Sequence, residues 1–151
     1  MNIYEKDIFS QPDDVRCALR YYAEQGYYEK VRELSKKHYE KIIMTGMGSS
    51  YSACMNAASQ LRIHGYNCSV QVTSQLLHYE LSSIDENTLL IIVSQSGQSG
   101  EIVEFVEKLS VPCTVVGLTN CDESPLGQHS DLLLNIHVPP EQAVSTRTYL
   151  A

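Results

Sequence analysis

Residues 89–101 read LLIIVSQSGQSGE, and this stretch decides which fold the chain can adopt. The unbroken apolar run at positions 89–93 predicts a buried strand. Apolar residues at positions 102, 103, 105, 106 and 109 recur at helical spacing and predict a helix over residues 101–109. A strand, a short polar turn and a helix in this order form the repeating unit of α/β proteins, in which parallel strands alternate with helices.

The turn at positions 94–99 is rich in hydroxyl groups. It contributes Ser94, Ser96 and Ser99, while Gly97 and Gly100 let the backbone bend and approach a ligand closely. The first turn of a helix leaves N–H groups without internal partners, and the helix dipole favours negative charge there. The stretch therefore predicts an anion site, most often one for phosphate. The alternative is an ordinary strand-to-helix loop in which Ser99 caps the helix.

The same alternation runs through most of the chain. Further strands are predicted at residues 41–45, 68–73, 114–118 and 132–136, and a further helix at 51–64. Residues 74–81 predict a short helix or a loop, and residues 124–127 a turn or a single helical turn. The predicted fold class is therefore α/β, with a doubly wound (flavodoxin-like) five-stranded parallel sheet and helices on both faces.

The N-terminal part of the chain departs from this pattern. Residues 3–10 are predicted to be irregular, with Ile8 and Phe9 as apolar anchors. A helix then begins near Pro12, and a second one covers residues 27–37. We expect residues 1–40 to form an N-terminal helical entry segment and residues 41–151 to form the main domain. Four tyrosines near Gly26 fit either a dimer contact or the covering of a sheet edge.

Composition excludes several classes of function. The chain has 151 residues, 43% of them hydrophobic, which suits one domain with a packed core. The 11 basic and 18 acidic residues give a formal net charge of -7, so neither nucleic acid nor an anionic membrane surface is an expected partner. No apolar run approaches the ~20 residues of a membrane span. The first residues also lack the basic-then-apolar form of a signal peptide, so we expect a cytoplasmic protein.

The cysteine pattern argues against a structural metal. The five cysteines are odd in number and show no C-x-x-C spacing, which indicates neither a disulfide framework nor a zinc site. We expect no bound metal and no other cofactor. Most of the cysteines are predicted to be buried free thiols.

A second glycine–serine turn follows the predicted strand at 41–45. Residues 46–50 read GMGSS, and in a parallel sheet both turns lie at carboxyl ends of strands, where ligands bind. Tyr51 replaces the third glycine of a dinucleotide fingerprint, and no lysine follows the glycines as in a Walker loop. Ser94 lies two residues before Ser96, where an esterase elbow needs glycine. What remains is a site of hydroxyls, backbone amides and two helix starts, suited to a small phosphate monoester.

The two turns together resemble those of the sugar isomerase (SIS) domain family. The segments that carry the resemblance are Gly48-Ser49-Ser50-Tyr51 and Ser94-Gln95-Ser96-Gly97-Gln98-Ser99. Residues 5–12, 73–79 and 141–149 are similar to further segments of the first SIS domain in the isomerising half of glucosamine-6-phosphate synthase and in related tandem-SIS deglycases. The resemblance covers essentially the whole chain and implies that residues 41–151 are a phosphosugar-binding SIS domain.

The resemblance also implies which residues contact a small-molecule sugar phosphate. Seven of them lie in the two turns, with Gly48, Ser49 and Ser50 lining the pocket and Ser94, Gln95, Ser96 and Ser99 holding the phosphate. Ser99 stands where the family often has threonine, which keeps the hydroxyl. Ser145 would lie near the open-chain sugar. The family further implies a homodimer, because its SIS domains complete their sites across an interface.

Catalysis is less clearly encoded. Aldose–ketose isomerisation needs a base that removes the proton alpha to the carbonyl and an acid that returns one. In tandem-SIS isomerases the base resembles a Glu in a Glu-x-x-His arrangement of the second domain, and the matching place here is Gln75-Leu76-Leu77-His78. Gln75 has no ionisable group, so His78 and the nearby Glu80 are the catalytic candidates. The family's late lysine has no counterpart in these 151 residues.

Two functions are therefore expected from the sequence. The first is the N-terminal half of a hexosamine or ketosamine phosphate isomerase or deglycase, since the chain ends shortly after an apparent helix start at Glu141. The second is a non-catalytic module that senses a phosphosugar, which the glutamine at position 75 motivates.

Overall fold

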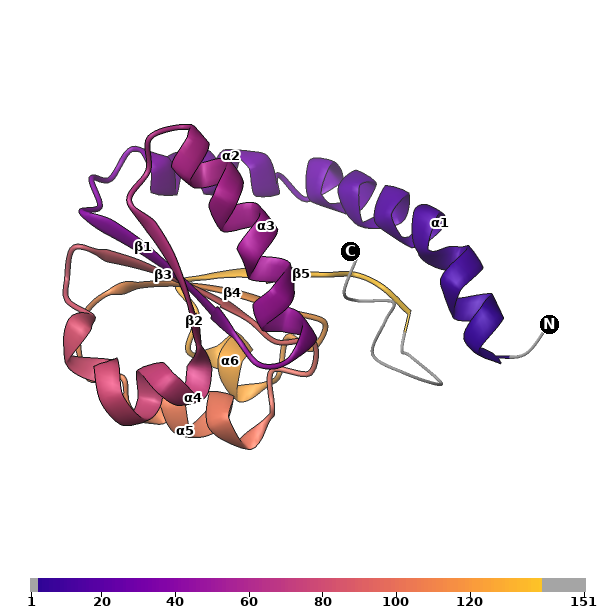
Figure 1. Ribbon diagram of the computed structural model, residues 1–151. Helices are drawn as coiled ribbons and strands as arrows, with labels where there is room; N and C mark the ends of the chain where they lie inside the picture. The colour runs from indigo at the N-terminus through magenta and orange to yellow at the C-terminus, as the bar shows by residue number, and fades with distance from the viewer. Residues whose placement is uncertain (1–2, 140–151) are drawn as a thin grey trace. The chain divides into compact units, whose positions relative to one another are not determined.

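Five parallel strands form one sheet in the order β2-β1-β3-β4-β5 (Figure 1). The computed structural model describes residues 3–139. The strands are β1 (Lys41–Gly46), β2 (Cys68–Val72), β3 (Thr88–Val93), β4 (Thr114–Thr119) and β5 (Leu132–Asn135). This order is the flavodoxin-like arrangement of a doubly wound sheet. The predicted fold class is confirmed.

Helices cover both faces of this sheet, as Figure 1 shows. On one face lies α3 (Ser49–Ile63); on the other lie α4 (Thr73–Gln75), the π-helix η1 (Leu76–Glu80), α5 (Gly100–Lys108) and α6 (Pro125–Gln128). The 3₁₀ turn η2 (Leu81–Ser83) follows η1. Because successive strand residues point to opposite faces, Ile42 and Met44 pack with α3, whereas Ile43 packs with η1 and α5. Alternate residues of one buried strand thus contribute to two hydrophobic cores, one on each face of the sheet.

The predicted element boundaries agree closely with the structure. The five strands and the helices α3 and α5 begin and end within two residues of the expected positions. Residues 124–127, expected as a turn or one helical turn, contain the start of the short α6. Residues 74–81, expected as a short helix or loop, lie in the successive turns α4, η1 and η2, which together cover residues 73–83.

The described residues divide into two compact units. The sheet and its helices make up residues 38–135, and the other unit joins residues 3–37 to residues 136–139. The second unit contains α1 (Ile3–Glu24) and α2 (Tyr27–Ser35), separated by Gly26 with a φ of 68°.

The prediction that residues 3–10 are irregular is wrong. The helix α1 runs without interruption from residue 3 to residue 24 and contains Pro12. A proline inside a helix lacks an N–H and crowds the carbonyl four residues earlier, which is why the sequence favoured a start there. Ser10 offsets part of this cost, because its hydroxyl lies 3.0 Å from both the Asp7 carbonyl and Asp14 Oδ2 and so links the turns before and after the proline. Ile8 and Phe9 are exposed rather than anchors.

Aromatic rings gather in the same unit. The rings of Tyr21, Tyr22 and Tyr27 lie 5.3–6.2 Å apart between centroids, and the His137 ring stacks on Tyr21 at 4.0 Å. Burial raises the pKa of the Tyr22 hydroxyl to about 12. The stacking joins the segment that follows β5 to the first helix of this unit.

The two phenylalanines of the chain provide a matched test of the core. Phe105 on α5 is 0% exposed, whereas Phe9 on α1 is 71% exposed. We expect Phe105→Ala to lower the free energy of unfolding by about 3–5 kcal/mol, because it leaves a cavity against Leu90 and Ile92. Phe9→Ala should change it by less than about 0.5 kcal/mol. Equilibrium denaturation in guanidinium measures both, and similar losses would contradict the assigned core.

Candidate functional site

The strand order switches direction at β1, which lies between β2 and β3. The chain leaves β1 toward β2 on one side and later returns to add β3 on the other. In sheets of this kind the connections above such a switch diverge, and ligands bind beyond the carboxyl ends of the strands there. The two connections at this point are the turns at residues 46–50 and 94–99, which the sequence singled out.

The turn after β1 approaches β3 closely. A Cβ atom on Gly46 would lie 2.9 Å from the Val93 carbonyl oxygen and 2.9 Å from the Ser50 Cβ, so only glycine lets the strand end, the helix start and β3 pack this tightly. Gly48 has a φ of 55° and open space around its Cβ position. It is the N-cap residue of α3 and is followed by the exposed Ser49, and no side chain caps this helix. The Ser50 amide donates to the Met47 carbonyl at 3.1 Å, and the other first amides of α3 are available to an anion.

The turn after β3 is held from inside. Ser94 is buried, and its Oγ accepts a hydrogen bond from the Gly97 amide at 3.2 Å. The Gln95 carbonyl accepts from the Asn120 amide at 2.9 Å and from the Thr119 hydroxyl at 3.1 Å. These bonds fix the turn against the end of β4, while Ser96 stays exposed.

Gly97 is required by this arrangement. Its φ is 64°, and a Cβ atom there would lie 2.2 Å from Ser124 Oγ. Ser124 in turn accepts from the Gly127 amide at 3.1 Å and caps α6. Thr119, Asn120 and Ser124 were not predicted as part of the site; the polar run after the fourth strand was the signal that could have identified them.

Ser99 occupies the N-cap position of α5, but its side chain makes no capping hydrogen bond. The alternative in which this serine only caps the helix is therefore not what the structure shows. Ser99 is half-buried, and Glu101 lies in the first turn of α5. Like α3, α5 starts with amides that no side chain caps.

All seven residues predicted in the two turns lie at or after the adjacent carboxyl ends of β1 and β3. Ser94 is buried, and the other six are at least partly exposed. Neither turn contains a lysine or arginine, so hydroxyls and backbone amides are the donors for an anion. Ser145 and Glu141 lie outside the described residues.

The catalytic candidates lie at the end of the neighbouring strand β2. Thr73 starts α4, and its hydroxyl is 3.0 Å from the hydroxyl of Thr45 at the end of β1. The Gln75 amide donates to Glu80 Oε1 at 2.6 Å. His78 is exposed, with its ring centroid 6.2 Å from that of Tyr79. A recess of about 470 Å³ is lined by Ser74, Gln75, His78 and Tyr79.

Gln71 also contacts the catalytic candidate Glu80, and the sequence did not predict this contact. It lies on β2, and its amide donates to Glu80 Oε2 at 2.8 Å. No sequence motif marks it, since its role depends on the turn that brings Glu80 back to the strand.

Metal and thiol chemistry find little support among residues 3–139. No group of three or more His, Cys, Asp or Glu side chains in this range could hold a metal ion. Cys54, Cys68 and Cys113 are buried free thiols, as predicted for most of the cysteines, and burial raises the pKa of Cys54 to about 11. Within the described part of the chain, no helix has the length and apolar content needed to cross a membrane.

Comparison with known proteins places this geometry in context. The family model described as the SIS domain matches residues 33–151. Over 147 residues the chain is 34% identical to the glutamine–fructose-6-phosphate aminotransferase [isomerizing] of Pyrococcus horikoshii, covering 95% of this chain and 24% of that protein. The chain thus spans about a quarter of the length of this relative.

Two solved structures are similar to the chain. The tagatose-6-phosphate ketose/aldose isomerase from Escherichia coli superposes with a TM-score of 0.76 at 27% identity, covering 93% of this chain and 41% of that one. The C-terminal domain of the glucosamine-fructose-6-phosphate aminotransferase from Francisella tularensis superposes with a TM-score of 0.85 at 23% identity, covering 98% of this chain and 43% of that one. The latter likeness concerns the fold.

Two glycines of the site turns allow a comparison of strain with crowding. Both Gly48 and Gly97 have positive φ, a backbone conformation that strains an alanine by roughly 1–3 kcal/mol. Only at Gly97 would the added Cβ collide with a neighbour. We therefore expect Gly97→Ala to lower the free energy of unfolding by about 1–3 kcal/mol more than Gly48→Ala. Denaturant titration measures the difference, and equal losses would show that Ser124 does not constrain the turn.

Proposed function

Because this chain belongs to the SIS domain family, we propose that it binds a sugar phosphate where β1 and β3 end. The single observation that carries this proposal is the pairing of two hydroxyl-rich turns, each followed by a helix start without a side-chain cap. Backbone amides at a helix start and the helix dipole both favour a phosphate group. The relatives' names support a phosphorylated sugar as the ligand class.

The hydrogen bonds inside the second turn support a donor role for its serines. A hydroxyl has one proton to donate and lone pairs that accept. Ser94 Oγ accepts from the Gly97 amide, and Ser96 Oγ accepts from the Gln98 amide at 3.3 Å. Their protons are thereby left for a phosphate oxygen. In this proposal Gln95 and Ser99 complete the phosphate site, and Gly48, Ser49 and Ser50 line the sugar side.

For the whole protein we propose an isomerase or deglycase that acts on a hexosamine or ketosamine phosphate, with this chain as its N-terminal half. Such a reaction needs a base and an acid near the open-chain sugar. His78 and Glu80 are the candidates, at the neighbouring strand end. Ser145 is proposed to lie near the sugar. Residues 1–40 would form the entry segment and residues 41–151 the phosphosugar-binding domain.

A non-catalytic sensing module is the alternative. It is favoured by Gln75, which cannot act as a base, and by the two amides that engage the Glu80 carboxylate. Turnover separates the two functions. Conversion between glucose 6-phosphate and fructose 6-phosphate by the intact chain would exclude the sensor, and its loss in His78→Asn would assign that histidine to proton transfer.

A homodimer in the cytoplasm completes the proposal. Family membership supports the dimer, and the metabolic enzymes among the relatives support the location. Sedimentation velocity tests the first statement: a single species with the mass of one chain would contradict it.

Removing one hydroxyl from the second turn should weaken ligand binding. We expect Ser96→Ala to raise the dissociation constant for glucosamine 6-phosphate and fructose 6-phosphate about tenfold or more, since a hydrogen bond to a charged group is worth roughly 1.5–3 kcal/mol. Isothermal titration calorimetry on the full chain measures this.

The matched control is Ser82→Ala, a change at an exposed serine of η2. This variant should bind both phosphosugars like the wild type, and fructose without phosphate should not bind measurably. No saturable binding by the wild type, or equal affinities for Ser96→Ala and Ser82→Ala, would contradict the proposed function.

A further inference from the structure

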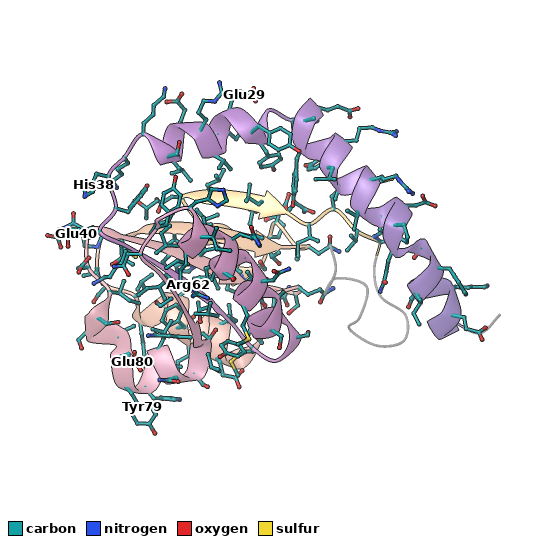
Figure 2. The ribbon with its side chains drawn as sticks, turned by 45° about the horizontal axis from the view of Figure 1, so that its top comes forward. Glu29, His38, Glu40, Arg62, Tyr79 and Glu80 are labelled. Atoms are coloured by element: carbon teal, nitrogen blue, oxygen red, sulfur yellow. The ribbon has the colours of Figure 1, made fainter. Side chains whose placement is uncertain are left out.

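A single π turn carries the catalytic candidate His78. This turn, η1, is of a type that is rare and occurs frequently at functional sites. Its first two side chains, Leu76 and Leu77, are buried in the hydrophobic core, whereas His78 and Tyr79 are exposed. Figure 2 shows Tyr79 projecting away from the sheet on the segment that also carries Glu80. The turn therefore has one side anchored in the core and presents its other side to solvent.

A side-chain bridge spans this turn. Gln75 immediately precedes η1, Glu80 is its last residue, and the Gln75 amide donates to Glu80 Oε1 at 2.6 Å. In an α-helix, side chains five residues apart point to different sides, because 3.6 residues complete a turn. The wider π turn brings these two side chains together. The bridge thus links the two ends of the segment that contains His78.

A second amide ties the same carboxylate to the sheet. Gln71 on β2 donates to Glu80 Oε2 at 2.8 Å, so each carboxylate oxygen accepts one amide N–H. The Gln71 Oε1, at the other end of this amide, is buried and has no hydrogen-bond partner among the described residues. A buried acceptor without a donor is unfavourable. A network that keeps its bond to Glu80 despite this cost is a candidate for a functional role.

The recess beside the turn separates the two catalytic candidates. Its volume is about 470 Å³, and the described residues that line it are Ser74, Gln75, His78 and Tyr79. Glu80 is not one of them, and both of its carboxylate oxygens are hydrogen-bonded to amides. A residue that transfers a proton must reach the substrate directly or through one water. His78 borders the recess and fits this requirement, whereas Glu80 holds the turn.

The π turn is also connected to the proposed phosphosugar site. Thr45 immediately precedes the turn at residues 46–50, and Thr73 opens the segment that leads into η1. Their hydroxyls lie 3.0 Å apart, and both side chains are fully buried. This hydrogen bond fixes the end of β1 against the start of α4. The recess and the phosphosugar site therefore lie at neighbouring strand ends of one sheet edge.

From these contacts we propose that His78 transfers the proton and that Glu80 is the residue that positions it. Gln71 and Gln75 hold the Glu80 carboxylate, and the bridge across η1 keeps the His78 imidazole at the recess. The proposal rests on the isomerase function proposed above. It gives the two catalytic candidates different roles, and it makes Gln71 part of the same positioning network.

The chemistry of an imidazole suits this role, because a neutral ring has one nitrogen that accepts a proton and one that donates. The imidazole takes the proton from C2 of the open-chain aldose, and the C–H electron pair forms the enediolate double bond with the charge on O1. The hydroxyl proton of O2 then passes to O1. The imidazolium returns its proton to C1, and the C2–O2 carbonyl of the ketose forms.

Replacements of Glu80 separate positioning from proton transfer. The measurement is kcat and KM for conversion of glucose 6-phosphate to fructose 6-phosphate by the intact chain. We expect Glu80→Ala to lower kcat about tenfold to 100-fold and to change KM less than about threefold, because a misplaced catalytic group slows the chemistry while the serine turns are unaltered. Glu80→Gln should stay within about fivefold of the wild-type kcat, since its amide can accept from Gln71 and donate to the Gln75 oxygen.

Two further variants keep the test decisive if Glu80→Ala fails to fold. Gln71→Met removes the donor on β2 together with the buried Oε1, so it should lower kcat about tenfold while the melting temperature stays near that of the wild type. Glu86→Ala removes an exposed carboxylate outside the network and should turn over like the wild type.

Three results would overturn the assignment. A loss of about 100-fold or more in Glu80→Gln would identify Glu80 as the base. Wild-type kcat in both Glu80→Ala and Gln71→Met would show that the network positions nothing. Absence of turnover by the wild type would remove the reaction itself, and calorimetric binding of the phosphosugars would then still decide the phosphosugar function separately.

Discussion

The close approach of β1 to β3 at their carboxyl ends is the constraint on which the rest of the site depends. Gly46 has no side chain, so the Val93 carbonyl and the start of α3 come within contact distance of its backbone. Any larger residue would separate the two strand ends and with them the two serine turns. The connections diverge at the switch in strand order, and this glycine keeps the two turns close enough for the one small ligand that we propose.

Internal hydrogen bonds decide what the serine hydroxyls can still do. Ser94 and Ser96 accept from backbone amides of their own turn, and the carbonyl of Gln95 is held by the end of β4. These bonds hold the turn in one conformation, which would lower the conformational entropy lost on binding a ligand. In the proposed site, neutral donors suit an acidic chain with a net charge of -7, because they would bind a small phosphate without a basic surface that would attract long polyanions.

The sequence predicted the sheet well because apolar runs and serine–glycine turns are local signals. It placed α1 too late, since Pro12 looks like a helix start, and only the contacts of Ser10 show how the helix passes through it. The π turn and the role of Gln71 could not be predicted, because periodicity does not distinguish a π turn and the Gln71–Glu80 bond depends on tertiary structure. The site turns were predictable; their internal hydrogen bonds were not.

The most direct test of the central claim is to observe the turns themselves during ligand addition. Glucosamine 6-phosphate titrated into the ¹⁵N-labelled chain should shift the backbone amide resonances of Ser49, Gly97 and Gly100 in two-dimensional NMR spectra, saturably and together. Glucosamine without the phosphate should leave them nearly unchanged. Shifts confined to other parts of the chain, or equal shifts with the unphosphorylated sugar, would contradict a phosphate site at the ends of β1 and β3.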